Sequence, residues 1–552
     1  MAEAAAPQVF TRRASGLVRV MSPYSAFIYN ILTMGIIFPW IWIQGPTNFE
    51  GANPTLAVFF AFLAEIPIAL AYAWLATALP RSGGDYVFQS RVFGGAFGFS
   101  AVLGLFVIWI LQWVALSGWL VATFALSPLF LGLGVNLEAQ WMIDFGKWAG
   151  TANGIVVISI VNAALSLALL VSGFRNYVRV QFVMWYWVLA SFGLMILLFL
   201  ITDVGEFQAK LNSFGGAITG VQNYYATAVA GAEAAGANLA PAFALGGTLL
   251  LAPVAWTSLQ WASYSVEQNG EIKNAHVFRN QLFILVASLA VTAGLLILLG
   301  LSMQKAIGEE GMIVASSGYW LGNADATLSG AILHPSVLGI ALTASPIIIA
   351  VIGIGFLLNA FQIVCNCYIG TTRIMVAQGL DGLLPDWFSR VHPRWKTPVN
   401  AHVAYFIGSV IVILLFNNKF PGLDVPDWST KWALGVTLAN GLVFTISALA
   451  AALLPYRAKA LYEASPGAKF KVGSVPLVTV LGGIGFVLGL LMCLAFLFVD
   501  ELGLAYSGDN PVPYILVIGA VVFSLIVYFV MRQTKARKGI KVEYAFSEIP
   551  PE

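Results

Sequence analysis

The chain has 552 residues, of which 59% are hydrophobic and only 9% are charged, with a formal net charge of +2. Soluble domains carry about 25% charged residues, so this chain lacks the polar side chains that a water-facing surface requires. Hydrophobic runs extend from end to end and leave no room for a soluble domain, and nothing in the charge balance points to nucleic acid. The composition therefore predicts a protein embedded in the lipid bilayer.

The cysteines do not suggest a metal site or disulfides, and the N-terminus does not suggest a signal peptide. Cys365, Cys367 and Cys493 lie in apolar stretches without the spacing of a metal site or a disulfide framework, so we expect no metal and no cofactor. The polar, basic N-terminal segment lacks the apolar core of a signal peptide. The first apolar run is therefore predicted to be a retained membrane span.

Twelve apolar runs are long enough to cross a membrane, which takes roughly 20 residues of helix. They are residues 23–44, 54–79, 97–127, 152–172, 180–202, 243–265, 281–303, 338–364, 400–416, 432–454, 477–499 and 513–531. Each run is continuously apolar rather than alternating, which favours helices over the strands of a barrel. The sequence predicts an all-α polytopic membrane protein with 12 transmembrane helices.

The distribution of Lys and Arg sets the orientation, because cytoplasmic loops are enriched in positive charge. With the N-terminus inside, 22 of the 27 basic residues lie on the cytoplasmic side. The five on the other side are Lys147, Lys210, Lys305, Lys419 and Lys431. One missed helix would have scrambled this bias. We therefore expect a multi-pass protein of the cell membrane with both termini in the cytoplasm.

The spans divide the chain into two sets of five and a final pair. In order, the predicted parts are a cytoplasmic N-terminal segment (1–22), a first repeat (23–202), an external loop (203–242), a second repeat (243–454), helices 11 and 12 (455–531) and a cytoplasmic tail (532–552). The external loop contains the Ala-rich stretch QNYYATAVAGAEAAGANLA, which is either a surface helix or a flexible loop.

The first and sixth spans carry residues that disfavour a straight helix. The first contains Asn30, Thr33, Gly35 and Pro39, and the sixth contains Pro253 followed by a polar segment up to Gln260. Interrupted helices at matching places in two halves are a sign of a binding site at the bilayer midplane. A break exposes amide groups that attract an anion and carbonyl groups that attract a cation. The alternative is that Pro and Gly are simply common in membrane helices.

Two loop motifs carry a family resemblance. Residues 75–99 read LATALPRSGGDYVFQSRVFGGAFGF, and residues 371–401 read TTRIMVAQGLDGLLPDWFSRVHPRWKTPVNA. They resemble the cytoplasmic loops after helices 2 and 8 of the amino acid–polyamine–organocation (APC) transporter superfamily. EIKNA at residues 271–275 is similar to that family's Glu-Val-Lys-Asn-Pro after helix 6. The resemblance covers helices 1–10, and helices 11–12 only by number.

This resemblance implies the five-plus-five inverted-repeat (LeuT-like) fold, in which helices 1 and 6 are broken around the substrate. It also implies that helix 1 amides bind the carboxylate of an amino acid and helix 6 carbonyls bind its amino group. The residues predicted to bind substrate are Asn30, Thr33, Met34, Gly35, Ile36, Gln112, Trp256, Thr257, Ser258 and Gln260.

The chain departs from the family pattern in the first break and in helix 5. The family's Gly-Ser-Gly in helix 1 is Thr-Met-Gly here, so only Gly35 remains. Bulky Gln260 and Trp261 stand where the family has a small residue in helix 6. Many proton-coupled members carry a Lys in helix 5, and residues 180–195 contain none. These departures predict an unusual pocket and a different coupling group.

Glu65 is a candidate coupling group because it is an acidic residue deep within an apolar span. A charged side chain at the centre of a membrane helix costs about 2.5–3.5 kcal/mol on insertion scales, so the neutral form is favoured and a proton carrier is a reasonable role. The alternative is a permanently protonated side chain that joins two helices by a hydrogen bond.

Other polar residues suggest cation binding and gating. Asn366 and Cys367 in helix 8 lie where related folds bind sodium, although interhelical hydrogen bonding explains the asparagine equally well. Trp109 and Trp113 in helix 3 are either pocket residues or packing residues. The four gating candidates in the loop motifs are Gly83, Gly84, Arg373 and Asp381, and we expect Asp381 and Arg373 together to form part of an intracellular gate.

The function expected from the sequence is secondary active transport of amino acids by alternating access, as a symporter or an exchanger. The coupling ion is H⁺ or Na⁺, and the substrate is expected to be neutral, large or aromatic. Alternatives are transport of polyamines or other small organic amines, or a transporter-like substrate sensor. No P-loop and no cluster of catalytic side chains is present, so we expect neither a nucleotide-driven pump nor an enzyme. The oligomeric state cannot be read from the sequence.

Overall fold

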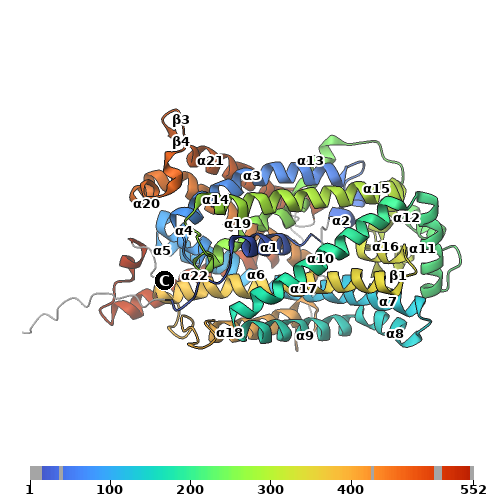
Figure 1. The fold of residues 1–552 in the computed structure, drawn as a ribbon, viewed down its shortest axis with the longest axis horizontal. Helices are drawn as coiled ribbons and strands as arrows, with labels where there is room; N and C mark the ends of the chain where they lie inside the picture. Colours follow the sequence, from blue (N-terminus) through green and yellow to red (C-terminus); the bar gives the residue numbers. More distant parts are fainter. Residues whose placement is uncertain (1–14, 37–40, 424–427, 503–511, 548–552) are drawn as a thin grey trace, which may run out of the picture.

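The computed structural model describes residues 15–36, 41–423, 428–502 and 512–547. Almost all of this part of the chain is helical, and the long helices run side by side along the longest axis of the molecule (Figure 1). Within the described residues, strands form only two short antiparallel hairpins. These pair β1 (Thr327–Leu328) with β2 (Ala331–Ile332) and β3 (Lys471–Val472) with β4 (Val475–Pro476).

Ten helices in the described ranges are long and apolar enough to cross a membrane, and they confirm the all-α polytopic fold. Six of these ten are single uninterrupted helices: α3 (Pro54–Ala78), α9 (Ala152–Val171), α10 (Phe174–Ile201), α17 (Pro346–Leu380), α18 (Val399–Phe416) and α19 (Trp428–Arg457). The last pair is α21 (Leu477–Phe498) and α22 (Val512–Ala536). Helix 3 is a continuous run of α5 (Gly95–Val102), η1 (Leu103–Val107), α6 (Ile108–Leu120), η2 (Val121–Leu126) and α7 (Ser127–Asn136). Helix 7 joins α14 (Phe278–Leu282), η4 (Phe283–Ala287) and α15 (Ser288–Trp320).

The two remaining predicted spans, 23–44 and 243–265, are the ones that the structure divides into shorter pieces. The first consists of α1 (Pro23–Met34) and α2 (Ile41–Asn48). α1 ends because Gly35 adopts the left-handed conformation, with φ of +67°, which glycine tolerates better than any other residue. The break expected in helix 1 is therefore present at Gly35.

The sixth span is divided in a different way from the one expected. α13 (Leu245–Leu259) continues into the 3₁₀ helix η3 (Gln260–Glu271), so the chain does not unwind between Trp256 and Gln260. A 3₁₀ helix bonds each amide to the third preceding carbonyl rather than the fourth, and its turns are narrower and longer. The change of helix type at Gln260 thus takes the place of an open break.

The eighth span is also displaced from its predicted position at 338–364. α16 (Pro335–Ala341) is a separate short helix, and α17 begins only at Pro346, where the side chain of Ser345 caps its first turn. α17 then continues to Leu380, so Thr371 to Leu380 of the second motif are helical rather than part of a loop. Arg373 therefore belongs to a transmembrane helix, while Asp381 caps the end of that helix.

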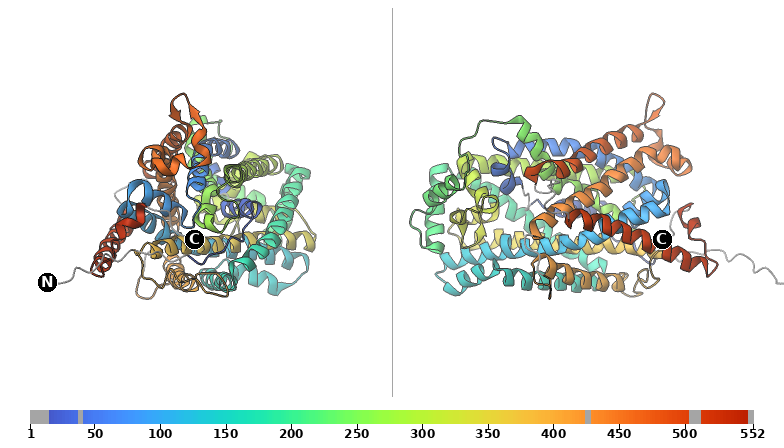
Figure 2. Two further views of the ribbon diagram at one scale, coloured as in Figure 1. Left: turned by 60° about the vertical axis from the view of Figure 1, so that its left-hand side comes forward. Right: turned by 180° about the vertical axis from the view of Figure 1, so that it is seen from behind.

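The short elements gather at the two ends of the helical bundle (Figures 1 and 2). The end predicted to be external, called the outer end here, carries α8 (Gln140–Ala149), α11 (Val204–Thr219), α12 (Tyr224–Ala234), η5 (Ala324–Ala326), α16 and η7 (Asp500–Leu502). The opposite, inner end carries α4 (Gly84–Phe93), α20 (Lys459–Glu463), η6 (Pro466–Lys469) and η8 (Val542–Ser547). The Ala-rich stretch forms α12, which resolves the choice between a surface helix and a flexible loop.

The divided helices lie against each other inside the bundle, where α1 packs on η3, η4, α15 and α17. Asn30 connects three of these elements: its side-chain amide donates to the Ile284 carbonyl at 3.0 Å, and its side-chain oxygen accepts from the Ser265 amide at 2.9 Å. Because Asn30 is fully buried, its hydrogen bonds hold α1 against η3 and η4. This contact positions the break of helix 1 beside the change of helix type in helix 6.

Candidate functional site

A small internal cavity lies where α1 ends and α13 gives way to η3. Its volume is about 30 Å³, and a cavity of that size holds roughly one or two water molecules. It is lined by Thr33, Met34, Gly35, Trp113, Leu120, Thr257, Ser258, Trp261, Tyr264, Ile363 and Cys367. The cavity therefore joins residues of helices 1, 3, 6 and 8.

Six of the residues predicted to bind substrate or a cation line this cavity together, and Trp113 of helix 3 lines it as well. The six are Thr33, Met34, Gly35, Thr257, Ser258 and Cys367. The other substrate-binding candidates are buried behind the lining: Asn30, Ile36, Gln112, Trp256 and Gln260. Gln260 donates weakly to the Thr257 carbonyl, at 3.4 Å. The structure thus places the break of helix 1 and the change of helix type in helix 6 at the same cavity. Half of the ten substrate-binding candidates line this cavity, and the other half lie buried behind its lining.

Aromatic side chains form one wall of the cavity. The ring of Trp261 lies perpendicular to those of Trp113 and Tyr264, with centroids 5.5 Å and 5.2 Å away. Edge-to-face contacts of this kind are favourable for aromatic rings. Trp261, which the sequence marks as a bulky departure from the family pattern, lines the cavity together with Tyr264, which the sequence analysis did not identify. The spacing of both residues after Thr257 and Ser258 places them on the same face of a helix. This helical spacing was the feature of the sequence from which both residues could have been predicted to line the cavity.

Side-chain amides cap the carbonyl groups at the end of α1. Asn359 donates to the Leu32 carbonyl at 2.9 Å, and Asn366 donates to the Thr33 hydroxyl at 2.7 Å. The Tyr177 hydroxyl in turn donates to the side-chain oxygen of Asn366 at 2.5 Å. The predicted cation residues are therefore split: Cys367 faces the cavity, whereas the Asn366 amide already donates to an oxygen of α1. Helix-end oxygens satisfied by neutral donors need no bound cation.

Glu65 contacts helix 6 directly behind the cavity. Its side chain is fully buried on α3, and its Oε2 atom accepts a hydrogen bond of 2.6 Å from the indole Nε1 of Trp256. Its Oε1 atom is buried without a hydrogen-bond partner. Trp256 is the neighbour in sequence of Thr257, which lines the cavity, so the Glu65 carboxyl group contacts the cavity lining only through Trp256. A buried carboxylate with an unsatisfied oxygen is costly, so this arrangement favours the neutral carboxylic acid.

The gating candidates Arg373 and Asp381 each form an ion pair with a different residue. Arg373 forms a bidentate ion pair with Glu271 of η3, with N–O distances of 2.6 Å and 3.1 Å. Asp381 accepts from Arg91 at 2.9 Å and from the Tyr86 hydroxyl at 2.7 Å. The extension of α17 explains the difference, because Arg373 lies two helical turns before Asp381 and faces η3. Two separate buried ion pairs therefore lie at the inner end.

Gly83 and Gly84 let α4 approach η3 closely. Gly83 has φ of +91°, and its amide donates to the Glu267 carbonyl at 2.7 Å. A Cβ atom on Gly84 would lie 2.6 Å from the Val266 side chain and 2.8 Å from its backbone, which is shorter than van der Waals contact. Both positions require glycine, one for its conformation and the other for lack of space.

Apart from Glu65, the fully buried acidic residues of the described ranges are Asp85, Glu267, Glu271 and Asp381, and they lie at the inner end. The first three could not be recognised as buried from the sequence because they lie outside the continuous apolar runs, in α4 and in η3. No group of three or more His, Cys, Asp or Glu side chains that could hold a metal ion occurs in the part of the chain that the structure describes. The buried acids are therefore candidates for ion pairs and proton binding.

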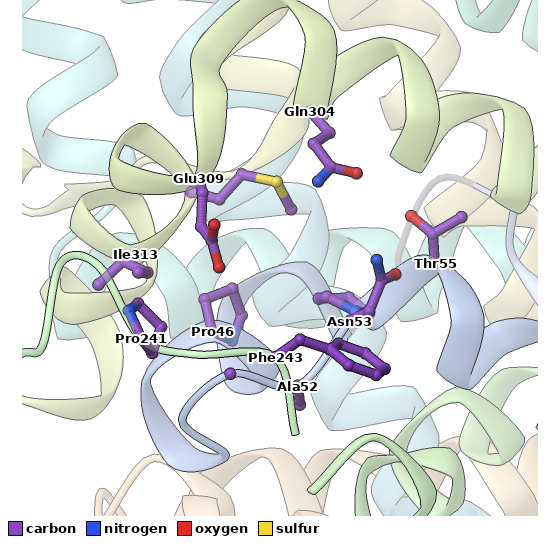
Figure 3. Close-up of a pocket in the computed structure, with 12 residues that line it drawn as sticks. Pro46, Ala52, Asn53, Thr55, Pro241, Phe243, Gln304, Glu309 and Ile313 are labelled. Carbon is purple, nitrogen blue, oxygen red and sulfur yellow. The ribbon is translucent and has the colours of Figure 1, made fainter. Parts of the chain in front are cut away.

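A second cavity of about 220 Å³ opens near the outer end. Figure 3 shows Gln304 and Glu309 on one side of it, facing Pro46, Asn53 and Phe243. The residues come from α2, the turn before α3, the segment before α13, and α15. This cavity lies beside the external half of helix 1 and forms a vestibule on that side of the molecule.

Comparisons with known proteins agree with this architecture. Residues 23–533 match the family described as amino acid permease. An 81-residue stretch is 33% identical to the branched-chain amino acid permease BcaP of Bacillus subtilis (strain 168), covering 15% of this chain and 17% of that protein. The alignment with BcaP thus spans about a sixth of its length, whereas the family match spans almost the whole chain. With its many membrane-spanning helices and its divided helices 1 and 6, the chain belongs to the amino acid permease family of the APC superfamily.

Proposed function

We propose that this protein transports neutral amino acids with apolar side chains by alternating access, and that the cavity between α1 and the α13–η3 junction is their binding site. The observation that carries the proposal is the lining of this cavity. It combines the ends of both divided helices with an apolar, aromatic wall, and its lining residues include no charged side chain. Family membership supports a transporter rather than an enzyme.

The helix ends suit the amino group of such a substrate. α1 ends at Met34 and α13 ends at Leu259, next to Ser258 of the lining. The C-terminal end of a helix carries the partial negative charge of the helix dipole, which attracts an ammonium group. The hydroxyl groups of Thr33, Thr257 and Ser258 supply the neutral polar contacts in the lining.

The remaining lining residues favour an apolar substrate side chain. Leu120, Ile363, Trp113 and Trp261 offer hydrocarbon and ring surfaces, and burying a full aliphatic side chain among them contributes about 1.5–3 kcal/mol. A cationic or anionic side chain would be desolvated there without a counter-ion. The same argument disfavours polyamines, which carry a second ammonium group. The naming of BcaP as a branched-chain permease points the same way.

The cavity must expand to accept a substrate, because about 30 Å³ holds only water. We therefore infer that the structure is a closed state between the outward-open and inward-open forms. The vestibule beside Glu309 is the outer approach. Two divided helices that end at the cavity can tilt separately, which is the motion that alternating access needs. The basic residues at the inner end support a plasma-membrane protein with both termini in the cytoplasm.

Uptake of radiolabelled leucine into proteoliposomes tests the proposed function. We expect saturable uptake that unlabelled isoleucine, valine and phenylalanine inhibit, whereas arginine, glutamate and putrescine do not. Equal inhibition by arginine or putrescine would overturn the assignment to neutral amino acids. If leucine raises the unfolding temperature but no flux occurs, the protein is a sensor and the transport proposal fails.

For coupling, we propose a proton carried by Glu65 rather than sodium. The Asn359 and Asn366 amides donate to oxygens at the end of α1, where a sodium ion would need free lone pairs. Glu65 is a buried carboxyl group bonded to helix 6 through Trp256, so its protonation state and the position of that helix affect each other.

A further inference from the structure

Asp85 and Glu267 form a pair of buried carboxyl groups at the inner end. Asp85 lies in the first turn of α4 and Glu267 in η3, and both side chains are fully buried. The Asp85 amide donates to Glu267 Oε1 at 3.2 Å, which places the Glu267 carboxyl group directly beside Asp85. No ion pair is formed by either group among the described residues. The pair therefore lacks a neutralising cation.

The hydrogen bonds around the pair leave one oxygen of each carboxyl group without a donor. The hydroxyl groups of Tyr72 and Ser447 both donate to Asp85 Oδ1, each at 2.5 Å. Asp85 Oδ2 and Glu267 Oε2 are buried and accept no hydrogen bond from another side chain or amide. Two adjacent buried acceptors of this kind are satisfied by one proton placed between them.

The other titratable groups around the pair do not supply a compensating charge. Besides Tyr72, the titratable group near Glu267 on the same helix is the hydroxyl of Tyr264. The two buried arginines at the inner end pair elsewhere, Arg91 with Asp381 and Arg373 with Glu271. Two unit negative charges about 4 Å apart repel by about 4 kcal/mol at an effective dielectric constant of 20. Full ionisation would therefore push the two carboxylates apart.

We propose that Asp85 and Glu267 share one proton, and that this proton-binding site holds the inner gate of the transporter closed. Loss of the proton to the cytoplasm leaves two adjacent carboxylates, and their repulsion separates α4 from η3. A cation such as sodium fits less well, because the hydroxyl groups of Tyr72 and Ser447 already direct their hydrogens at Asp85 Oδ1. The site is distinct from Glu65, which contacts Trp256 behind the cavity.

The surrounding contacts connect this site to the cavity. Tyr72 belongs to α3 and Ser447 to α19, so hydrogen bonds hold Asp85 to both of these helices. Glu267 belongs to η3, which also carries Trp261 and Tyr264 of the cavity lining. Directly after Glu267, the backbone of Gln268 leaves helical geometry, with φ of −109° and ψ of 26°. Movement of Glu267 away from α4 therefore displaces the inner half of helix 6 and opens the cavity, a consequence that rests on the proposed transport function.

Hydrogen exchange of the full chain in lipid nanodiscs, measured by mass spectrometry and corrected for the intrinsic effect of pH, tests the proposal without substrate. In the wild type we expect exchange in residues 79–93 and 260–275 to rise about tenfold or more from acidic to alkaline buffer, as the gate opens locally. In Glu267→Gln, the side-chain amide donates to Asp85 in place of the shared proton, so these segments should stay protected at every pH. Asp85→Asn should behave in the same way and serves as the second variant if the first fails to fold.

Glu463→Gln is the matched control, because Glu463 is exposed on α20 and pairs only with Lys459 among the described side chains. It should keep the wild-type pH response. An unchanged exchange pattern across pH in the wild type, or a full response in both Glu267→Gln and Asp85→Asn, would overturn the shared proton. Protection that sodium restores in alkaline buffer would identify a cation site instead and also overturn it. Because exchange needs no flux, a pH response without leucine uptake would contradict only the proposed function.

Discussion

Replacement of Gly35 by leucine is expected to abolish leucine binding and uptake. Gly35 ends α1 with φ of +67°, and residues with a Cβ atom pay roughly 1–2 kcal/mol to adopt that left-handed conformation. The new side chain would also enter a cavity of only about 30 Å³. Strain at the break and loss of space act together, so the effect on binding should be complete rather than partial. Thermal shift with leucine and uptake into proteoliposomes measure it.

Gly193→Leu is the control for Gly35→Leu. Gly193 lies in α10 on an exposed face, and a Cβ atom there would meet nothing within 4 Å. It should therefore bind and transport leucine like the wild type. If Gly35→Leu still shows a leucine-dependent thermal shift, the substrate binds elsewhere in the molecule.

Replacement of Glu65 by glutamine is expected to remove the proton-driven accumulation of substrate while leaving leucine binding largely intact. Glutamine keeps a side-chain oxygen that accepts from Trp256 Nε1, as Glu65 Oε2 does at 2.6 Å, but it cannot release a proton. With an imposed proton gradient, leucine should therefore enter only until its concentrations inside and outside the proteoliposomes are equal. Leucine–leucine exchange, which needs no net proton movement, should continue.

Glu206→Gln controls for the removal of an acidic side chain. Glu206 lies at the outer end on α11, where it pairs with Lys210 and is half exposed. Its replacement should change neither accumulation nor exchange, since exposed ion pairs contribute at most about 1 kcal/mol. An unchanged response of Glu65→Gln to the proton gradient would remove Glu65 from the coupling mechanism.

The membrane spans could be predicted because the length of an apolar run directly reflects the thickness of the bilayer. The length of apolar runs does not predict the ends of a helix where buried polar residues continue it. Residues 371–380 look like a polar loop but continue α17, since their side chains are buried against η3 and α4. The break at Gly35 was predictable from one residue with permissive backbone geometry. The 3₁₀ segment η3 was not, because it has no such local signal.

The partners of buried charged residues could not be predicted, because they depend on how distant segments pack. Arg373 and Asp381 are eight positions apart in one motif, yet they pair with Glu271 and Arg91. The second acidic residue of the proposed proton site, Glu267, is 182 positions from Asp85. In the cavity, Tyr264 was not identified from the sequence because tyrosine is frequent throughout this apolar chain. Contacts between residues so far apart in the sequence become visible only in the three-dimensional structure.

The central claim is that the substrate occupies the cavity where α1 and α13 end. A cryo-electron microscopy structure of the protein with saturating leucine in nanodiscs tests it most directly. The account predicts density for leucine in contact with Gly35 and Ser258, with the leucine side chain against Trp261 and the cavity enlarged. Leucine density confined to the outer vestibule at Glu309, with the inner cavity unchanged, would contradict it.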